Sequence, residues 1–147
     1  MSVEDGTVAL QFGDAEYSFR IAFGQWRELQ ESINRPRIEM GHPVIGPAPL
    51  IQSLLMLSAW PHDVREVIRI GLIGGGMKSD RALVLVKRYV DGKPFFSNTL
   101  LAGKVLRTAM FGPEDDPVGK DPAPPEPEAA TEDNQSGLVN STGSVLQ

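Results

Sequence analysis

The sequence predicts an α+β domain in which an N-terminal β-hairpin precedes about five short helices, with a disordered acidic tail at the C-terminus. Three observations predict this class. Apolar residues alternate near the start of the chain, they recur every three or four residues from residue 23 to residue 110, and the composition changes at residue 113. A chain of 147 residues suits one domain with a tail, so we assign residues 1–112 to the domain and 113–147 to the tail.

The charge distribution separates the same two parts. Residues 113–147 carry −7, from eight acidic residues and one basic residue, whereas residues 1–112 carry +2. The tail also holds half of the 12 prolines and no aromatic residue, and such a composition buries too little apolar area to offset the entropy of ordering. The nearly neutral domain is not typical of a polyanion or polycation binder, so no nucleic-acid partner is predicted.

Two short runs near the N-terminus alternate apolar and polar residues, which predicts a β-hairpin with one buried face. The apolar positions are Val8, Leu10 and Phe12 in the first run and Tyr17, Phe19 and Ile21 in the second. The segment Gly13-Asp14-Ala15-Glu16 between them supplies the turn. Because a lone hairpin is marginally stable in water, its apolar face should pack on the helices.

The first helix is predicted over about ten residues. Its apolar stripe consists of Phe23, Trp26, Leu29 and Ile33, and this register places Trp26 in the core. Asn34 and Pro36 should end the helix, since proline and the residue before it both disfavour helical structure. Residues 36–49 contain four prolines and two glycines and are expected to form a loop.

Two helices should follow this loop. Pro49 can open a largely buried helix that runs to about Leu57, and Trp60-Pro61 breaks it. The third helix then begins at Pro61 and stops at Gly74-Gly75-Gly76, because glycine permits left-handed termination. Its inward residues are Val64, Val67, Ile68 and Leu72, and its outward residues are Arg65, Glu66 and Arg69.

A fourth and a fifth helix complete the domain. Ser79 is the predicted N-cap of the fourth helix, and Asp91-Gly92 closes it. Its apolar stripe is Ala82, Leu83, Val86, Tyr89 and Val90. The last helix is expected at about 97–110, with Leu100, Leu101, Val105, Ala109 and Met110 on its apolar side.

No motif for catalysis stands out, and the sequence predicts a non-enzymatic protein without catalytic residues, cofactor or metal. The glycine-rich run from Gly71 to Ser79 lacks the lysine directly after the last glycine that a phosphate loop needs, so a helix–helix turn is favoured. The two histidines, His42 and His62, have no supporting carboxylates at helical spacing. Glu28 and Glu31 are interpreted as a solvated face, and the chain has no cysteine.

Two further surfaces and the question of a membrane span remain. Lys87, Arg88 and Lys93 precede Phe95-Phe96, a pattern that single-strand nucleic-acid binders use, but a solvated helix face with two buried phenylalanines is favoured. For Trp60, packing and exposure at a partner surface both stay open. The longest apolar run, Leu50–Trp60, is too short to span a membrane, and the N-terminus carries no secretory signal, so a cytoplasmic protein without a membrane partner is predicted.

The chain resembles the gene transfer agent tail protein family of phage-like gene clusters, which is grouped with phage tail assembly chaperones. The resemblance spans about residues 5–112, while the acidic tail lies outside it. It rests on the N-terminal hairpin and helix and on the segment 63–112, and its most telling pieces are Val64-Arg65-Glu66-Val67-Ile68, Leu72-Ile73-Gly74-Gly75-Gly76, Tyr89-Val90-Asp91 and Phe111-Gly112. The proline-rich loop at residues 38–49 is longer than the family pattern leads us to expect.

The resemblance implies a helper of tail assembly in a prophage or gene transfer agent. The expected role is a chaperone that binds the tape-measure protein and assists assembly of tail-tube subunits around it. The alternative is a structural minor tail or tail-tube component that stays in the particle. For the partner surface we predict Leu101, Val105 and Met110, with a core position as the alternative for these three residues, and we expect the acidic tail to keep the protein soluble.

Overall fold

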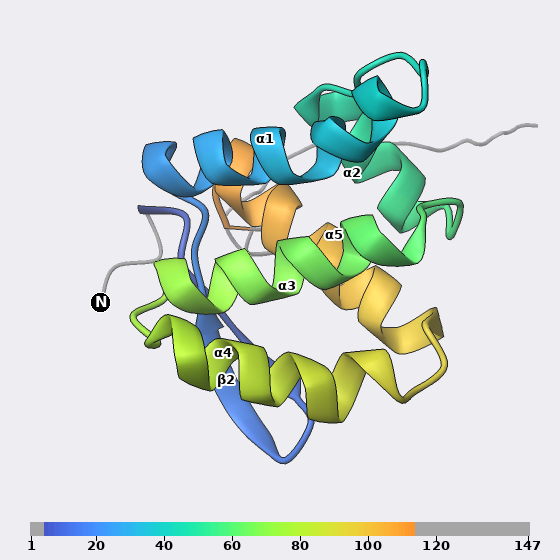
Figure 1. Cartoon of the computed structure of the whole chain (residues 1–147). Coiled ribbons are helices and arrows are strands. Elements are labelled where there is room, and N and C mark those ends of the chain that lie inside the picture. Colours follow the sequence, from blue (N-terminus) through green and yellow to red (C-terminus); the bar gives the residue numbers. More distant parts are fainter. Residues whose placement is uncertain (1–4, 114–147) are drawn as a thin grey trace, which may run out of the picture. The chain divides into compact units, whose positions relative to one another are not determined.

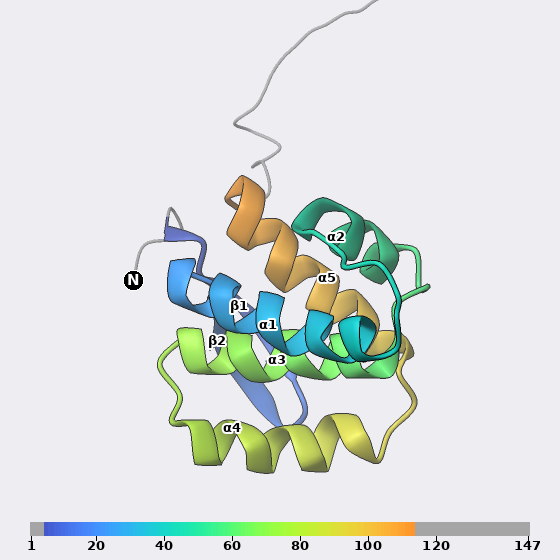
Figure 2. The same cartoon turned by 45° about the horizontal axis from the view of Figure 1, so that its top comes forward.

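The computed structural model describes residues 5–113 and confirms the predicted class, with a two-stranded antiparallel hairpin followed by five helices (Figures 1 and 2). The predicted tail beyond Pro113 lies outside the described residues. The elements are β1 (Val8–Phe12), β2 (Ala15–Phe19), α1 (Phe23–Glu39), α2 (Pro47–Leu55), α3 (Pro61–Gly74), α4 (Ser79–Val86), the π-helical segment η2 (Lys87–Asp91) and α5 (Phe96–Phe111).

The hairpin packs on the helices through one face, as its alternation predicts. β1 and β2 pair in a register that sets Val8 opposite Phe19, and Phe12 and Phe19 are 3% and 0% exposed. Gly13 at the turn has φ +63°, and a Cβ there would lie 2.5 Å from the ring of Tyr89. Only glycine suits both conditions, so this turn fixes how the hairpin meets η2.

Helix α3 is the centre of the domain. It lies between α1 and α4 in both views and contacts α1, α4, α5 and β2 (Figures 1 and 2). The four residues predicted to face inward, Val64, Val67, Ile68 and Leu72, are all fully buried. The prediction that Glu66 faces solvent is wrong, because this side chain is 5% exposed and pairs with arginines, as described below.

Helix α1 continues to Glu39, so the predicted end at Pro36 is wrong. Pro36 has no N–H to donate to the carbonyl of Ser32, which is the usual cost of proline inside a helix. Here the Nε2 atom of His62 lies 3.1 Å from that carbonyl oxygen. Since a carbonyl can only accept, His62 donates the hydrogen bond that Pro36 cannot, and a residue 30 positions away makes the proline tolerable.

The glycine run ends α3 but also does more than the sequence analysis predicted. Gly71, Gly74 and Gly75 lie on one helix face, and β2 runs close against it. A Cβ on Gly74 would lie 1.8 Å from the carbonyl oxygen of Arg20, and one on Gly75 would lie 2.1 Å from that of Ser18. The backbone N–H of Arg20 donates to the carbonyl of Gly71 at 3.0 Å. The run is therefore a close helix–strand contact, and no phosphate loop is formed.

Several local predictions need correction. Helix α2 begins two residues before Pro49 and ends at Leu55, and α4 begins at Ser79 with Lys78 as its N-cap. Some side chains predicted to face inward are exposed instead. They are Phe23 at 77%, Leu55 at 39%, Leu57 at 47%, Leu83 at 36%, Phe95 at 39% and Phe96 at 64%. Leu57 lies beyond the end of α2 and Phe95 just before α5; Phe23, Leu55, Leu83 and Phe96 lie on helices, but within residues 5–113 the fold does not cover these side chains.

Candidate protein-binding surfaces

The three residues predicted to bind a partner lie on α5 but in different surroundings. Leu101 is 9% exposed and Val105 is 1% exposed, and both belong to the core cluster. Met110 is 40% exposed near the end of the helix. The burial of Leu101 and Val105 matches the core position that the sequence analysis kept as an alternative, and partner binding by the three residues stays a prediction.

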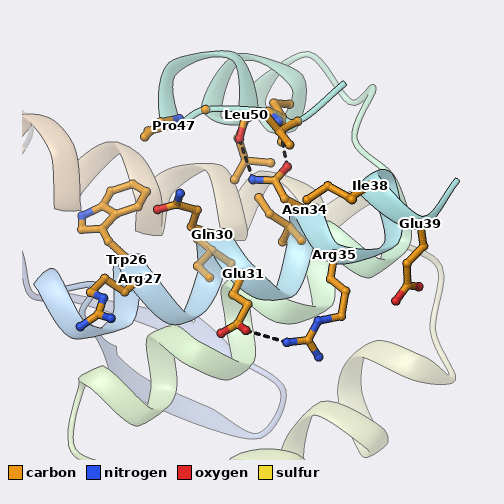
Figure 3. Close-up of a pocket in the computed structure, with 15 residues that line it drawn as sticks. Trp26, Arg27, Gln30, Glu31, Asn34, Arg35, Ile38, Glu39, Pro47 and Leu50 are labelled. Atoms are coloured by element: carbon orange, nitrogen blue, oxygen red, sulfur yellow. Dashed lines mark hydrogen bonds and ion pairs between the residues drawn. The ribbon is translucent and has the colours of Figure 1, made fainter. Parts of the chain in front are cut away.

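A groove of about 940 Å³ runs along α1 on the side that faces α2 (Figure 3). Its floor is apolar and contains Leu29, Ile33 and Leu50, which are at most 2% exposed. Trp26 stands at one end, partly buried and packed against the core. Ile38 stands near the other end (Figure 3). Ile38 and Val44 both line the groove and are 63% and 62% exposed, so the groove presents apolar surface to solvent.

Asn34 holds the wall of the groove opposite α1 in place. Its side-chain amide donates to the carbonyl of Ile45 at 3.2 Å, and its carbonyl oxygen accepts from the N–H of Ile45 at 2.8 Å. This pair of hydrogen bonds fixes the proline-rich loop against α1 and explains why an asparagine is buried there. The groove is thus a built feature of the fold.

Four charged residues line the solvent edge of this groove at intervals of four residues. We call Arg27, Glu31, Arg35 and Glu39 the charge ladder; all four are exposed and line the groove (Figure 3). Arg35 donates to Glu31 at 2.6 Å. Arg27 and Glu39, at the two ends, have no ion-pair partner among residues 5–113. Sequence reasoning missed the ladder, although its spacing and alternating sign are visible in the sequence.

Exposed apolar side chains also gather at one end of the domain. In both views the end of α1, the α2–α3 connection and the start of α5 lie at this end (Figures 1 and 2). We call the exposed residues Met40, Met56, Leu57, Trp60 and Phe96 on these segments the apolar end; each is at least 47% exposed. Leu57 has φ +61°, which costs about 1 kcal/mol for a residue with a Cβ. Of the two alternatives for Trp60, packing and exposure, the structure shows exposure, at 73%.

Charged side chains, in contrast, fill the contact between α1 and α3, which we call the charged seam. Asp63 is 2% exposed, and Arg37 donates to its two carboxylate oxygens at 3.1 and 2.7 Å. Arg69 donates to both oxygens of Glu66 at 3.0 and 2.7 Å. Bidentate pairs of this kind are the strong charge-assisted hydrogen bonds. The Arg37–Asp63 pair joins α1 to α3, whereas Arg69 and Glu66 both lie on α3.

Glu66 is the most heavily contacted member of the seam. Its Oε1 atom also accepts from the Ser32 hydroxyl at 2.6 Å. Burial raises the pKa of Glu66, but the hydrogen bonds from Arg69 and Ser32 outweigh burial and hold the pKa below its usual value. A carboxylate that stays ionised and paired has a structural role, and it is poorly suited to take up a proton near neutral pH.

The remaining candidates from the sequence do not assemble into a site within residues 5–113. No group of three or more potential metal ligands occurs in this range. His42 is exposed, and His62 donates a hydrogen bond to the carbonyl of Ser32. Glu28 lies 3.6 Å from Arg69, at the margin of the charged seam. Within the described part of the chain, no helix is long and apolar enough to cross a membrane.

These features define a small α+β domain whose buried charges are paired within the fold and whose conspicuous free surfaces are apolar. The chain belongs to the family described as phage tail tube protein, GTA-gp10, whose family model matches residues 5–112. This match confirms the resemblance to a gene transfer agent tail protein and covers almost all of the described domain. No curated protein and no solved structure matches the chain.

Proposed function

We propose that the protein is a non-enzymatic structural component of a phage-type tail that stays in the assembled particle and binds other tail proteins. Membership of a tail tube protein family supports this role. The observation that carries the proposal is the apolar end: exposed apolar side chains on three separate segments form the kind of surface that marks a protein interface. The core does not need these side chains, and Leu57 holds a strained conformation among them.

A second candidate is the predicted assembly chaperone, which would bind the tape-measure protein in the cytoplasm and leave before the particle is complete. One observation favours it. Residues 5–113 contain only the two strands of one hairpin, so the described part of the chain offers little sheet edge from which a continuous tube wall could be built. Apolar surfaces on a small helical domain suit transient cover of another protein's apolar segments.

Quantitative mass spectrometry of purified particles separates the two roles. A structural component should be present in a fixed ratio to the other tail proteins. If the protein is abundant in producing cells but absent from intact particles, the structural role is excluded. A tape-measure protein that becomes insoluble when this gene is deleted, and soluble again on complementation, would then establish the chaperone role.

A further inference from the structure

We infer that two copies of this chain associate through α1, in antiparallel orientation about a twofold axis, and so cover the groove. The occupant of the groove edge is thus a second copy of the protein. The observation behind this inference is the order of charges along the ladder, which is positive, negative, positive, negative from Arg27 to Glu39.

Such an order is complementary to itself when one copy is reversed. A twofold axis near the middle of α1 sets Arg27 opposite Glu39 of the partner, and Glu31 opposite Arg35 of the partner. All four positions then face an opposite charge, as an isologous interface requires. In a parallel pairing with the same register, each charge would face its like, so the ladder also selects orientation.

The state of the ladder in one copy agrees with this arrangement. Glu31 and Arg35, in the middle, already pair with each other at 2.6 Å. Arg27 and Glu39, at the ends, have no ion-pair partner among residues 5–113 and differ in sign. In the antiparallel pair each end residue meets the unpaired end residue of the other copy, which completes the row.

The apolar side chains beside the ladder supply most of the affinity. Trp26 lies near the start of the row and Ile38 near its end (Figure 3), so reversal places Trp26 of each copy against the exposed Ile38 of the other groove. Exposed ion pairs contribute only about 0.2–1 kcal/mol each, whereas burial of apolar area is the larger favourable term. The charges therefore mainly set register and orientation. From Trp26 to Glu39 the helix extends about 20 Å, which is a small interface and predicts a weak dimer.

Charge reversal on the full chain tests this inference. Arg27→Glu with Arg35→Glu makes the ladder wholly negative, and Glu31→Arg with Glu39→Arg makes it wholly positive. Sedimentation velocity over a range of concentrations should show the wild-type chain dimerising and each variant dimerising at least about tenfold more weakly. An equimolar mixture of the two variants should dimerise at least as well as the wild type, because every facing pair is again opposite in sign.

A matched control keeps the charge change and moves it away from the groove. Arg88→Glu with Lys93→Glu alters the net charge as much as the negative variant, at two exposed positions outside the groove lining, and should leave dimerisation unchanged. In a Trp60→Phe background, Trp26 is the single tryptophan. Its emission should shift to the blue as the concentration rises, at lower concentration for the wild-type ladder and the control than for either charge-reversal variant. Circular dichroism checks that each variant folds.

Three results would overturn the inference. The first is a wild-type chain that stays monomeric at every concentration. If Leu138→Asp also changes the emission of Trp26 in this monomer, the occupant of the groove is the chain's own C-terminal segment. The second is a dimer that the charge reversals leave unchanged. The third is a mixture of the two variants that fails to associate.

Discussion

The two sides of α1 differ in a way that inverts the usual arrangement of polar and apolar side chains. Toward α3, the charged seam buries Asp63 and Glu66 to 5% exposure or less. Toward α2, the groove leaves Ile38 and Val44 more than 60% exposed. On the first side the fold supplies every buried charge with an arginine. On the second side the floor of the groove is buried, but nothing within residues 5–113 covers Ile38 and Val44.

This difference separates residues that serve the fold from residues that are free to serve a partner. Breaking a buried ion pair is costly, because the remaining charge is left without compensation, so the seam is a fixed part of the domain. An exposed apolar side chain contributes little to the stability of one copy. Mutations in the charged seam or in the glycine contact should therefore change the free energy of unfolding. Mutations in the groove or the apolar end should instead change binding to a partner.

The largest effect on the packed side should come from Gly74→Ala. The added Cβ would lie 1.8 Å from the carbonyl oxygen of Arg20, a backbone atom that cannot rotate away, so we expect a loss of about 4 kcal/mol in the free energy of unfolding. Urea denaturation followed by circular dichroism measures it. Gly24→Ala is the control, because nothing lies within 4 Å of its added Cβ; it should be neutral or stabilise by about 0.5 kcal/mol. Equal effects for the two variants would contradict the close contact.

The glycine run shows how far the sequence could predict the packed side. Periodicity was sufficient for the hairpin, for the buried face of α3 and for the number of helices, because each of these depends on local order of apolar and polar residues. The close approach of β2 was not predicted, since a glycine that ends a helix and a glycine that admits a strand look alike in a single sequence. The spacing of Gly71, Gly74 and Gly75 on one face was the available signal.

The next effect in size should come from Glu66→Gln, which removes the bidentate partner of Arg69 and leaves it only the longer contact with Glu28 at 3.6 Å. We expect a loss of about 3 kcal/mol at neutral pH. The pKa of Glu66 in the fold lies below its usual value of 4.5, so the carboxylate's contribution is fully present above that value and is lost as the pH falls through the folded pKa. Urea denaturation of both proteins should therefore show their difference shrinking below about pH 4.5. A difference that stays constant with pH would show that the charge is not responsible.

Glu66 and the end of α1 were mispredicted for a shared reason. An acidic residue on a helix is usually solvated, and a proline usually ends a helix. Both rules give way here to side-chain partners, which are Arg69 of the same helix with Ser32 of α1 for Glu66 and His62 of α3 for Pro36. Two of these partners come from another helix and are brought close only by the fold, so local patterning cannot reveal them.

A smaller effect should come from His62→Ala, which removes the hydrogen bond to the carbonyl of Ser32. We expect a loss of about 1 kcal/mol in the free energy of unfolding. In a Pro36→Ala background the new backbone N–H can bond to that carbonyl, so the same His62→Ala change should cost less. A double-mutant cycle by urea denaturation measures the coupling. An identical cost in both backgrounds would mean that His62 does not compensate for the proline.

Mutations in the apolar end should have the smallest effect on stability. The same mutations should have the largest effect on assembly. Met56 and Trp60 are 67% and 73% exposed, so replacing both by serine should change the free energy of unfolding by no more than about 0.5 kcal/mol. Incorporation into particles, measured by mass spectrometry, should fall sharply, since the surface proposed to meet other tail proteins loses the two most exposed large apolar side chains of its α2–α3 connection. Val84→Ser is the control, because Val84 is 53% exposed on α4, a helix that contributes no residue to the apolar end, and should leave incorporation unchanged. If the double variant enters particles normally, the apolar end is not the contact with other tail proteins. The groove would then be the one surface, among those described, whose residues are free to bind a partner.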